Sequence, residues 1–267
     1  MRNEKYKDVI SLNEISRFLS KKIRSCEIKI YDSLDSTNTK AKELVISGAK
    51  HGTILIAERQ TAGRGRINRR FFSPTGSGVY MSVILKSGQL RDNTPVSALV
   101  TAYAAVSVCE AIENSANKFP QIKWVNDVFL NGRKICGILT EAVAGSVIVG
   151  VGINFTEPED GFPDEIKDIA GALFSETPIV SRNRLAAEIV GRILAYDMKS
   201  DNTTLLSEYK KRLMTLGKRI IIEIAGNAPY EAIAVDIDAQ GRLMVEKDDG
   251  EVETLLFGEI RVIGDYH

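Results

Sequence analysis

The sequence lacks the features that mark several large classes of protein. Its three cysteines, Cys26, Cys109 and Cys136, have neither zinc-binding nor redox spacing, and so sparse and odd a number is typical of a reducing compartment. The longest stretch without a charged residue, Asn93 to Cys109, is shorter than the roughly 20 residues that span a bilayer. The charged N-terminus leads into no apolar signal segment. We therefore expect a cytoplasmic protein that does not enter a membrane.

Net charge is also absent, because 35 basic side chains balance 35 acidic ones. This balance argues against a dedicated nucleic-acid coat protein, so any electrostatic function has to come from a local cluster of charge. Hydrophobic residues make up 44% of the 267 residues, which excludes disorder as the global state and allows a large buried core.

The apolar pattern predicts alternating helices and strands up to residue 216. Asn131-Gly132 is a strong hairpin signal between two of the strands, and Thr94-Pro95 is a suitable start for a long buried helix. An acidic segment with two prolines, 156–163, is interpreted as a surface loop. We expect helices within the first 25 residues and over 36–47, 94–113, 181–199 and 203–216, and strands over 27–32, 53–57, 79–85, 122–125, 128–130, 133–141 and 146–155.

A change of pattern at Gly217 indicates a second domain. Beyond it, short strands are expected over 219–224, 230–237, 243–246, 253–257 and 260–263. Five short strands in so few residues suggest a small barrel packed on the preceding domain. We therefore divide the chain into a short N-terminal helical segment (1–30), a central domain (31–216) and a C-terminal barrel (217–267).

The segment from Arg59 to Arg70 is the most unusual in the chain, with five arginines and no acidic residue in twelve positions. Gly63 and Gly65 allow the backbone to approach a ligand closely, and guanidinium groups suit carboxylate and phosphate oxygens. A solvated basic loop or a nonspecific nucleic-acid surface fits the same composition equally well. The segment matches neither the P-loop nor the dinucleotide-binding fingerprint.

Two further segments carry candidate chemistry. The hairpin at Asn131-Gly132 can bring Asp127 and Lys134 together, giving a carboxylate able to bind a metal beside a cation. An ordinary cross-strand salt bridge explains the same pair. The segment Asp35-Ser36-Thr37-Asn38 is a helix N-cap, whose free N–H groups could also contact a polar ligand.

Taken together and in order, these segments resemble the biotin protein ligase family, biotin–[acetyl-CoA-carboxylase] ligase. Ser82 and Gly150-Val151-Gly152-Ile153-Asn154 also fit the family pattern, and the resemblance extends from about residue 30 to the C-terminus. It implies an α+β catalytic domain, with a central mixed or antiparallel sheet and flanking helices, followed by a small SH3-like β-barrel. The matching segments are Asp35-Ser36-Thr37-Asn38, Gln60-Thr61-Ala62-Gly63-Arg64-Gly65-Arg66, Lys123-Trp124-Val125-Asn126-Asp127 and Lys134-Ile135-Cys136-Gly137.

The resemblance implies a two-step reaction. Biotin and MgATP give biotinyl-5′-AMP and pyrophosphate, and biotin then passes to a lysine of a biotin carboxyl carrier protein or domain of a biotin-dependent carboxylase. By the resemblance, Lys134 and Arg66 are catalytic, and Asp127 serves Mg²⁺. The implied biotin-binding residues are Ser36, Thr37, Asn38, Gln60, Gly63, Arg64, Gly65, Arg66, Lys134 and Gly137. The implied ATP-binding residues are Arg69, Phe71, Asn126, Asp127 and Asn154.

The sequence departs from the family pattern at two positions and raises one geometric question. Phe71 stands where the family commonly has Trp, which reduces the stacking area for adenine, and Val125 replaces a proline. In an ideal strand Lys134 and Gly137 would point to opposite faces. Their shared role therefore requires a bulge near Cys136, or contact through the backbone of Gly137.

Three other functions fit parts of the same sequence. A lipoate or octanoate ligase or transferase shares the central fold, but the full Gly-Arg-Gly-Arg segment and the terminal barrel favour biotin. A DNA-binding repressor needs at least two docked helices, and only one convincing helix precedes Ser36, so we expect no specific DNA binding. RNA binding lacks an aromatic stacking surface. The sequence leaves homodimerisation open.

Overall fold

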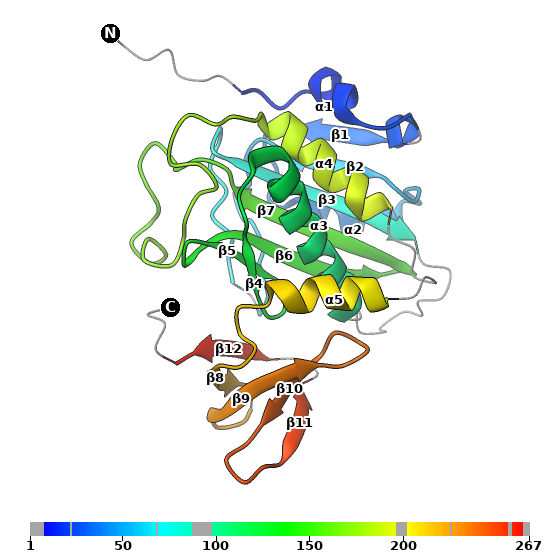
Figure 1. The fold of residues 1–267 in the computed structure, drawn as a ribbon. Helices are drawn as coiled ribbons and strands as arrows, with labels where there is room; N and C mark the ends of the chain where they lie inside the picture. The colour runs from blue at the N-terminus through cyan, green and yellow to red at the C-terminus, as the bar shows by residue number, and fades with distance from the viewer. Residues whose placement is uncertain are drawn as a thin grey trace.

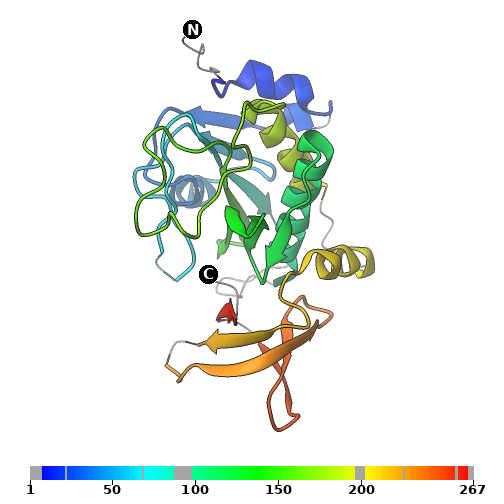
Figure 2. The same ribbon diagram turned by 60° about the vertical axis from the view of Figure 1, so that its left-hand side comes forward.

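Two β-sheets organise the protein. The computed structural model describes residues 8–21, 23–67, 69–86, 98–195, 202–224, 226–255 and 258–263. A seven-stranded mixed sheet has the order β1-β2-β3-β7-β6-β5-β4, and a five-stranded sheet has the order β11-β10-β9-β8-β12. The smaller sheet lies at one end of the larger unit, and α1 lies at the opposite end (Figures 1 and 2).

The larger sheet is antiparallel except where β1 pairs in parallel with β2. The helices and strands expected from the sequence are confirmed, with ends that differ by a few residues. The expected helix start at Thr94-Pro95 and the helix residues beyond 195 lie outside the described residues. The strands are β1 (Ile28–Tyr31), β2 (Ile54–Ala57), β3 (Gly78–Lys86), β4 (Gln121–Lys123), β5 (Asp127–Leu130), β6 (Arg133–Val143) and β7 (Ser146–Asn154). The helices are α1 (Leu12–Phe18), a short 3₁₀ helix (Ile23–Ser25), α2 (Thr37–Ile46), α3 (Ala98–Ala116), α4 (Arg182–Leu194) and α5 (Thr203–Arg212).

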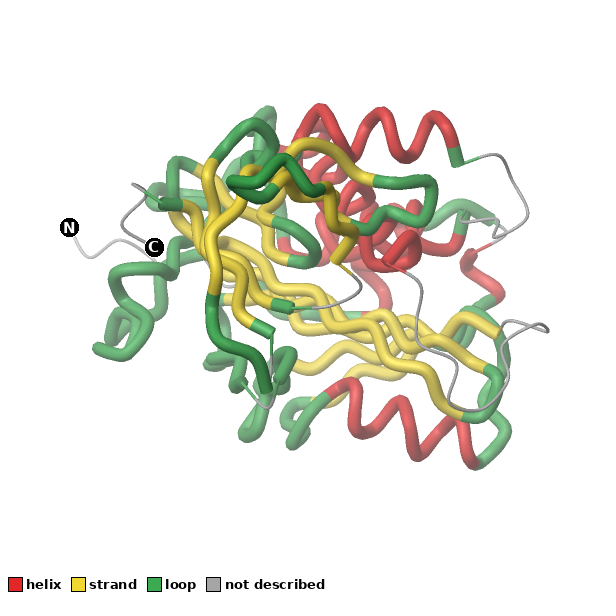
Figure 3. The backbone as a smooth tube through the Cα atoms, turned by 90° about the horizontal axis from the view of Figure 1, so that it is seen from below, coloured by secondary structure: helices red, strands yellow, loops and turns green. Residues whose placement is uncertain are grey.

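The two faces of the larger sheet are covered unequally. Figure 3 shows helices on both sides of the sheet. On one face lies α2, whose Ala41 and Val45 pack with Leu55, Ile84 and Ile148 in a small apolar cluster. The other face packs against α3 and α4 in the main core. Because α2 covers only part of its face, the rest of that face is free to form a site.

Several turns and helix ends form where short local patterns favour them. Ser11 caps α1 by accepting from the Glu14 N–H at 3.2 Å, whereas the Ser11 N–H donates to Asn183 Oδ1 at 2.9 Å. The Ser11 N–H therefore does not make the reciprocal bond to Glu14 that would complete a capping box. Asn131 and Gly132 have φ values of 51° and 74°, the left-handed pair that a tight two-residue hairpin requires.

The five-stranded C-terminal sheet is antiparallel throughout its pairs. Over the described residues, β11 and β12 are its two edges and do not pair with each other, so the expected closure into a barrel is not seen. Trp124 Nε1 donates to the Gly241 carbonyl at 3.2 Å and so links the sheet to the larger unit. The strands are β8 (Arg219–Glu223), β9 (Tyr230–Ile237), β10 (Leu243–Glu246), β11 (Val252–Leu255) and β12 (Glu259–Val262).

Arg182 at the start of α4 is a buried cation that the sequence did not single out. It is 2% exposed, and its Nη1 donates to Glu58 Oε1 at 2.8 Å and to the Gly78 carbonyl at 3.1 Å. We expect Arg182→Ala to lower the free energy of unfolding by about 3 kcal/mol or more, because it leaves Glu58 without its cation. Urea denaturation measures this loss, and Arg184→Ala, an exposed arginine on the same helix, is the control. Equal stability of the two variants would contradict the prediction.

Candidate functional site

A cavity of about 250 Å³ lies on the face of the larger sheet that α2 leaves uncovered. The residues predicted from the sequence converge here: all of them except Gly63 line this one cavity. These are Ser36, Thr37, Asn38, Gln60, Arg64, Gly65, Arg66, Arg69, Phe71, Asn126, Asp127, Lys134, Gly137 and Asn154. Strand β6 runs along the cavity from Lys134 past Gly137 and Leu139, and so defines two ends of it.

The end near the start of α2 is built from neutral hydrogen-bonding groups. The Thr37 N–H and hydroxyl donate to Gln60 Oε1 at 2.8 and 3.2 Å, and Gln60 Nε2 donates to Ser73 Oγ at 2.9 Å. One Gln60 amide hydrogen is not used in these bonds. The Ser36 oxygen accepts from the Thr39 N–H at 3.5 Å, which leaves the hydroxyl hydrogen available. This end suits a neutral ligand group that needs both donors and acceptors.

Asn38 anchors the start of α2 to the sheet. Its Nδ2 donates to the Leu139 carbonyl at 3.1 Å and to Glu141 Oε2 at 3.0 Å, and its Oδ1 accepts from Ser82 Oγ at 2.6 Å. Both amide hydrogens are therefore already engaged within the protein. A Cβ at Gly150 would lie 2.2 Å from Asn38 Oδ1, so the glycine at 150 makes room for this amide.

Glycines on β6 and β7 form the floor of the cavity. Gly137 and Gly152 pair across the two strands, and the Phe71 ring lies over both. A Cβ at Gly152 would lie 2.6 Å from the Phe71 ring, and a Cβ at Gly137 would lie 3.3 Å from it. The missing side chains thus leave a flat surface that accepts an aromatic ring.

The opposite end of the cavity is charged. Lys134 Nζ lies 2.7 Å from Asp127 Oδ2, which confirms that the hairpin brings these two residues together. Asp127 Oδ1 is buried and accepts no hydrogen bond from any described residue. A buried carboxylate oxygen without a partner is the kind of atom that receives a cation or a donor from a ligand.

A β-bulge resolves the question of how Lys134 and Gly137 reach the same ligand. Phe129 pairs with Lys134 and Val128 pairs with Cys136, so Ile135 is the extra residue in β6. The alternation of side chains shifts by one position at this point, and both Lys134 and Gly137 line the cavity. Of the two alternatives that the sequence left open, the bulge near Cys136 is the one that forms, at Ile135.

The two asparagines at this end fix the backbone around the cavity. Asn126 Oδ1 accepts from Arg66 Nη1 at 3.1 Å, and Asn126 Nδ2 donates to the Ile138 carbonyl at 3.0 Å. Asn154 Nδ2 donates to the Gly171 carbonyl at 3.0 Å. Each amide therefore joins two separate segments of the cavity wall.

The arginine-rich loop is folded back on itself. The Gly65 N–H donates to the Arg69 carbonyl at 2.7 Å, and the Phe71 N–H donates to the Gly63 carbonyl at 2.9 Å. Gly63 lies behind the cavity wall, where an added Cβ would approach the Phe71 carbonyl oxygen to 2.4 Å. Only glycine fits at position 63 without moving the loop.

Three arginines of this loop have partners that are distant in sequence. Arg64 Nη1 lies 3.0 Å from Glu141 Oε2, Arg69 pairs with Glu259, and Arg66 Nη2 donates to the Gly258 carbonyl at 3.2 Å. Acceptors on β6 and on the second sheet therefore partly offset the repulsion among these like charges. Neither acidic residue belongs to a motif, so no local signal could have identified them.

Lys123 lines the charged end but was not among the predicted site residues. Burial lowers the pKa of Lys123, and the positive charges of Lys134 and Arg69 lower it further. The negative charge of nearby Asp127 opposes this shift but does not reverse it. Its place directly before Trp124 in a matched motif was the available signal. Lys123 adds a partly desolvated cation to the end of the cavity that already holds Lys134.

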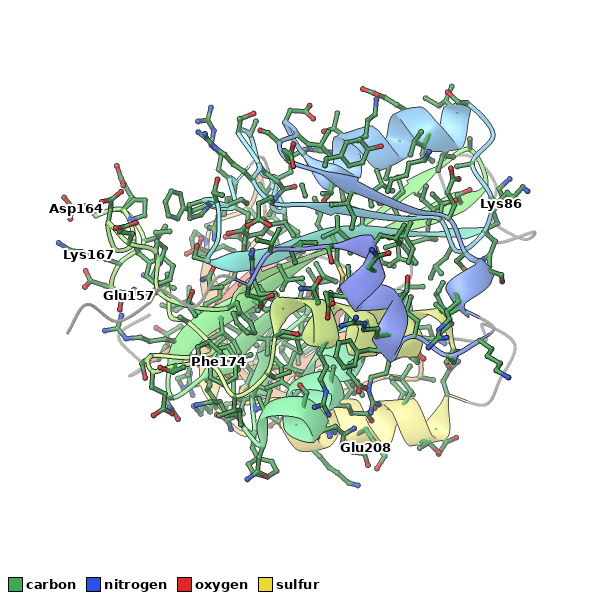
Figure 4. The ribbon with its side chains drawn as sticks, turned by 90° about the horizontal axis from the view of Figure 1, so that it is seen from above. Lys86, Glu157, Asp164, Lys167, Phe174 and Glu208 are labelled. Atoms are coloured by element: carbon green, nitrogen blue, oxygen red, sulfur yellow. The ribbon has the colours of Figure 1, made fainter. Side chains whose placement is uncertain are left out.

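The segment after β7 forms an outer wall of the cavity through Ile166, Ile169 and Ala170. It is held to β6, because the Lys134 N–H donates to the Ile169 carbonyl at 2.8 Å. Figure 4 places Glu157, Asp164 and Lys167 together on this segment, at the end of the molecule opposite Lys86. The charged residues of 156–163 are exposed, as predicted for a surface loop.

Proteolysis tests whether bound ligands order the arginine-rich loop. We expect trypsin to cut between Arg59 and Arg70 in the ligand-free protein, and biotin plus ATP to suppress the cleavage, because bound anions add countercharge and favour one ordered conformation. Mass spectrometry of the fragments locates the cuts, and cleavage elsewhere in the chain is the internal control. Identical cleavage rates at the loop with and without the ligands would refute the prediction.

The described residues hold neither a metal-binding cluster nor a membrane-spanning helix. No cluster of three or more His, Cys, Asp or Glu side chains in this part of the chain could hold a metal ion on its own. None of the helices described is long and apolar enough to cross a membrane.

Comparisons with known proteins agree with this geometry. Residues 30–156 match the Biotin/lipoate A/B protein ligase family, and residues 215–262 match the Biotin protein ligase C terminal domain. A biotin–[acetyl-CoA-carboxylase] ligase of Mycobacterium tuberculosis is 33% identical over 229 residues, which cover 82% of this chain and 83% of that protein. The bifunctional ligase/repressor BirA of Bacillus subtilis is 42% identical over 169 residues, which cover 61% of this chain; the match spans about half (51%) of that relative's length.

A solved structure extends the similarity to the three-dimensional fold. Biotin protein ligase from Aquifex aeolicus in complex with biotin and ATP superposes with a TM-score of 0.75 at 26% sequence identity. The alignment covers 88% of this chain and 98% of that protein. On the family matches, the relative from M. tuberculosis and this fold, the chain belongs to the biotin protein ligase family.

Proposed function

We propose that the protein activates biotin with ATP to biotinyl-5′-AMP and transfers biotin to a lysine of a biotin carboxyl carrier protein or domain. The observation that carries the proposal is the two-ended cavity, which is neutral and hydrogen-bonding at one end and cationic at the other. Biotin has the same division, with a neutral ureido group at one end and a carboxylate at the other. The names of the relatives and of the Aquifex complex support the same assignment.

In this proposal the neutral end receives the ureido group. Ser36 and Gln60 each keep a hydrogen that makes no hydrogen bond to another described residue, and Thr37 holds the Gln60 amide in place. Asn38, whose amide hydrogens are already engaged, contributes through the position of α2. Gly63, Arg64 and Gly65 bring the loop over the bound biotin, and Gly137, which lies under the Phe71 ring, leaves room beside it.

The cationic end receives the biotin carboxylate and the α-phosphate of ATP. Attack of the carboxylate on phosphorus gathers negative charge, which the fixed cations Lys134 and Arg66 stabilise better in the transition state than in the ground state. Phe71 offers a ring for adenine, and Arg69, Asn126 and Asn154 hold the nucleotide and its phosphates. No covalent protein nucleophile is needed.

The donor set fits a magnesium ion that arrives with ATP. Mg²⁺ is commonly bound by one or two carboxylates together with substrate phosphates, and Asp127 Oδ1 is a buried carboxylate oxygen without a hydrogen bond from the described residues. Asp127 would hold the ion there, where it neutralises phosphate charge. Asn126 lies beside it in sequence, with its Oδ1 turned to Arg66.

We further propose the finer organisation expected from the sequence. The chain divides into 1–30, 31–216 and 217–267, and the five-stranded sheet, whose edge strands do not pair over the described residues, is an open form of the SH3-like barrel. The protein works in the cytoplasm on a carboxyl carrier partner, and it acts on biotin rather than on lipoate or octanoate. The sequence also allows a homodimer, and the molecular mass measured by analytical ultracentrifugation tests whether it forms.

Transfer to a carrier domain tests the proposal. With biotin, ATP and Mg²⁺, the protein should add one biotin mass to a purified biotin carboxyl carrier domain, and substitution of the acceptor lysine by Arg should abolish the addition. A lipoyl domain supplied with lipoate is the comparison substrate. Modification of the lipoyl domain in preference to the carrier domain would favour the lipoate alternative and overturn the proposal.

A further inference from the structure

Glu141, near the end of β6, is a carboxylate with an unusually complete set of partners. Its Oε1 lies 2.7 Å from Lys42 Nζ, and its Oε2 accepts from Asn38 Nδ2 and from Arg64 Nη1, each at 3.0 Å. Only 17% of its side chain is exposed. The three donors come from two segments: α2 supplies Asn38 and Lys42, and the arginine-rich loop supplies Arg64.

The partners of Glu141 differ in their relation to the cavity. Asn38 and Arg64 line it, whereas Glu141 and Lys42 do not. Any effect of Glu141 on a ligand therefore has to pass through Asn38 or Arg64. Nothing in the sequence motifs assigns a role to Glu141 or to Lys42.

Glu141 is held in its charged form. Burial alone would raise its pKa, but hydrogen bonds from Lys42 and Asn38, with the charges of Lys42 and Arg64, outweigh burial and lower the pKa. A carboxylate that accepts from charged donors makes shorter and stronger hydrogen bonds than a neutral amide does. The anion at 141 therefore fixes both neighbours more firmly than a neutral side chain could.

The Glu141 carboxylate holds both neighbours against β6. The Asn38 amide is locked between Glu141, the Leu139 carbonyl and Ser82, which fixes the first turn of α2 where Ser36 and Thr37 meet the cavity. The Arg64 guanidinium is tied to Glu141 on β6, which fixes this part of the loop beside the same end. Without the anion, both constraints weaken together.

We propose that Glu141 is a positioning residue for the neutral end of the cavity, where it joins the arginine-rich loop to α2 through Arg64 and Asn38 and so sets the affinity for the ligand head group. This inference rests on the proposed function, in which that head group is the ureido end of biotin. Glu141 should therefore affect the binding of biotin but not the binding of ATP, because the charged end of the cavity is built from other residues, Asp127 and Lys134.

The test is Glu141→Gln, which keeps the shape of the side chain but removes its charge. Titration calorimetry should show the Kd for biotin rising about tenfold or more, while the KM for ATP in pyrophosphate release at saturating biotin stays within about twofold. Glu43→Gln is the matched control, because Glu43 is an exposed carboxylate on α2 that pairs with Lys40 and does not line the cavity. It should leave both values unchanged.

Two further variants separate positioning from simple loss of structure. Lys42→Met removes a partner of Glu141 outside the cavity and should weaken biotin binding by less than Glu141→Gln but more than the control. Arg64→Met should weaken biotin binding, and its combination with Glu141→Gln should cost clearly less than the product of the two single effects, because both remove the same contact.

The outcomes are distinct. An unchanged Kd for biotin in folded Glu141→Gln, or equal losses for biotin and ATP, would overturn the role of Glu141. If Glu141→Gln does not fold, Lys42→Met binding biotin as tightly as Glu43→Gln would overturn it. Absence of biotin binding by the unaltered protein would instead overturn the proposed function.

Discussion

Lys134→Ala should slow the formation of biotinyl-5′-AMP by about 100-fold or more. Lys134 lines the charged end of the cavity, and a fixed cation at the reacting phosphate is typically worth about 3 kcal/mol or more in the transition state. The loss should fall on kcat as well as on kcat/KM, because the negative charge that Lys134 meets is greatest in the transition state. Pyrophosphate release measured against biotin concentration gives both constants.

The same substitution should also lower stability, but by much less. Lys134 is paired with Asp127 at 2.7 Å, and the two side chains are 30% and 24% exposed, so the pair contributes about 1 kcal/mol. Lys211→Ala, an exposed lysine on α5 paired with Glu208, is the control for loss of one positive charge. A folded Lys134→Ala protein that forms the adenylate at the normal rate would remove Lys134 from the mechanism.

Gly63→Ala should impair the enzyme as severely, through the geometry of the loop. The added Cβ would lie 2.4 Å from the Phe71 carbonyl oxygen. Because the Phe71 N–H is also bonded to the Gly63 carbonyl at 2.9 Å, the backbone segments at residues 63 and 71 would have to move apart. Displacement of catalytic groups by about 1 Å can cost about 100-fold in rate. We expect a loss of this size in kcat/KM for biotin.

Gly65→Ala provides a comparison within the same motif. A Cβ at Gly65 would lie 3.4 Å from the Arg69 carbonyl oxygen, an ordinary contact, so this variant should lose far less activity than Gly63→Ala. Steady-state kinetics on both variants, with melting temperatures to confirm folding, decide the matter. Equal losses at the two glycines would show that the contact with Phe71 is not the reason for glycine at 63.

Much of the fold could be predicted because its signals are local. The Ser36 cap of α2, the Asn131-Gly132 turn and the buried run of β2 each depend on a few neighbouring residues. The bulge in β6 was one of two alternatives that followed from a different kind of argument, since Lys134 and Gly137 had to meet one ligand. Both kinds of inference use residues that are close in sequence.

The contacts missed by the sequence analysis join distant segments. Glu141 meets Arg64 across 77 positions, and Glu259 meets Arg69 across 190. The burial of Arg182 against Glu58 depends on how α4 packs on the sheet, which no periodicity reveals. Barrel closure was inferred from the number and shortness of the strands, but pairing of the first and last strands of a sheet depends on its twist and curvature rather than on local pattern.

The most direct measurement of the central claim is mass detection of biotinyl-5′-AMP after incubation of the protein with biotin, ATP and Mg²⁺. The adenylate should accumulate with all three present, disappear when any one is omitted, and fall sharply with Lys134→Ala. No biotinyl-5′-AMP from a folded protein, with lipoyl- or octanoyl-AMP formed or not in a parallel incubation that supplies lipoate or octanoate, would contradict the claim that this cavity activates biotin.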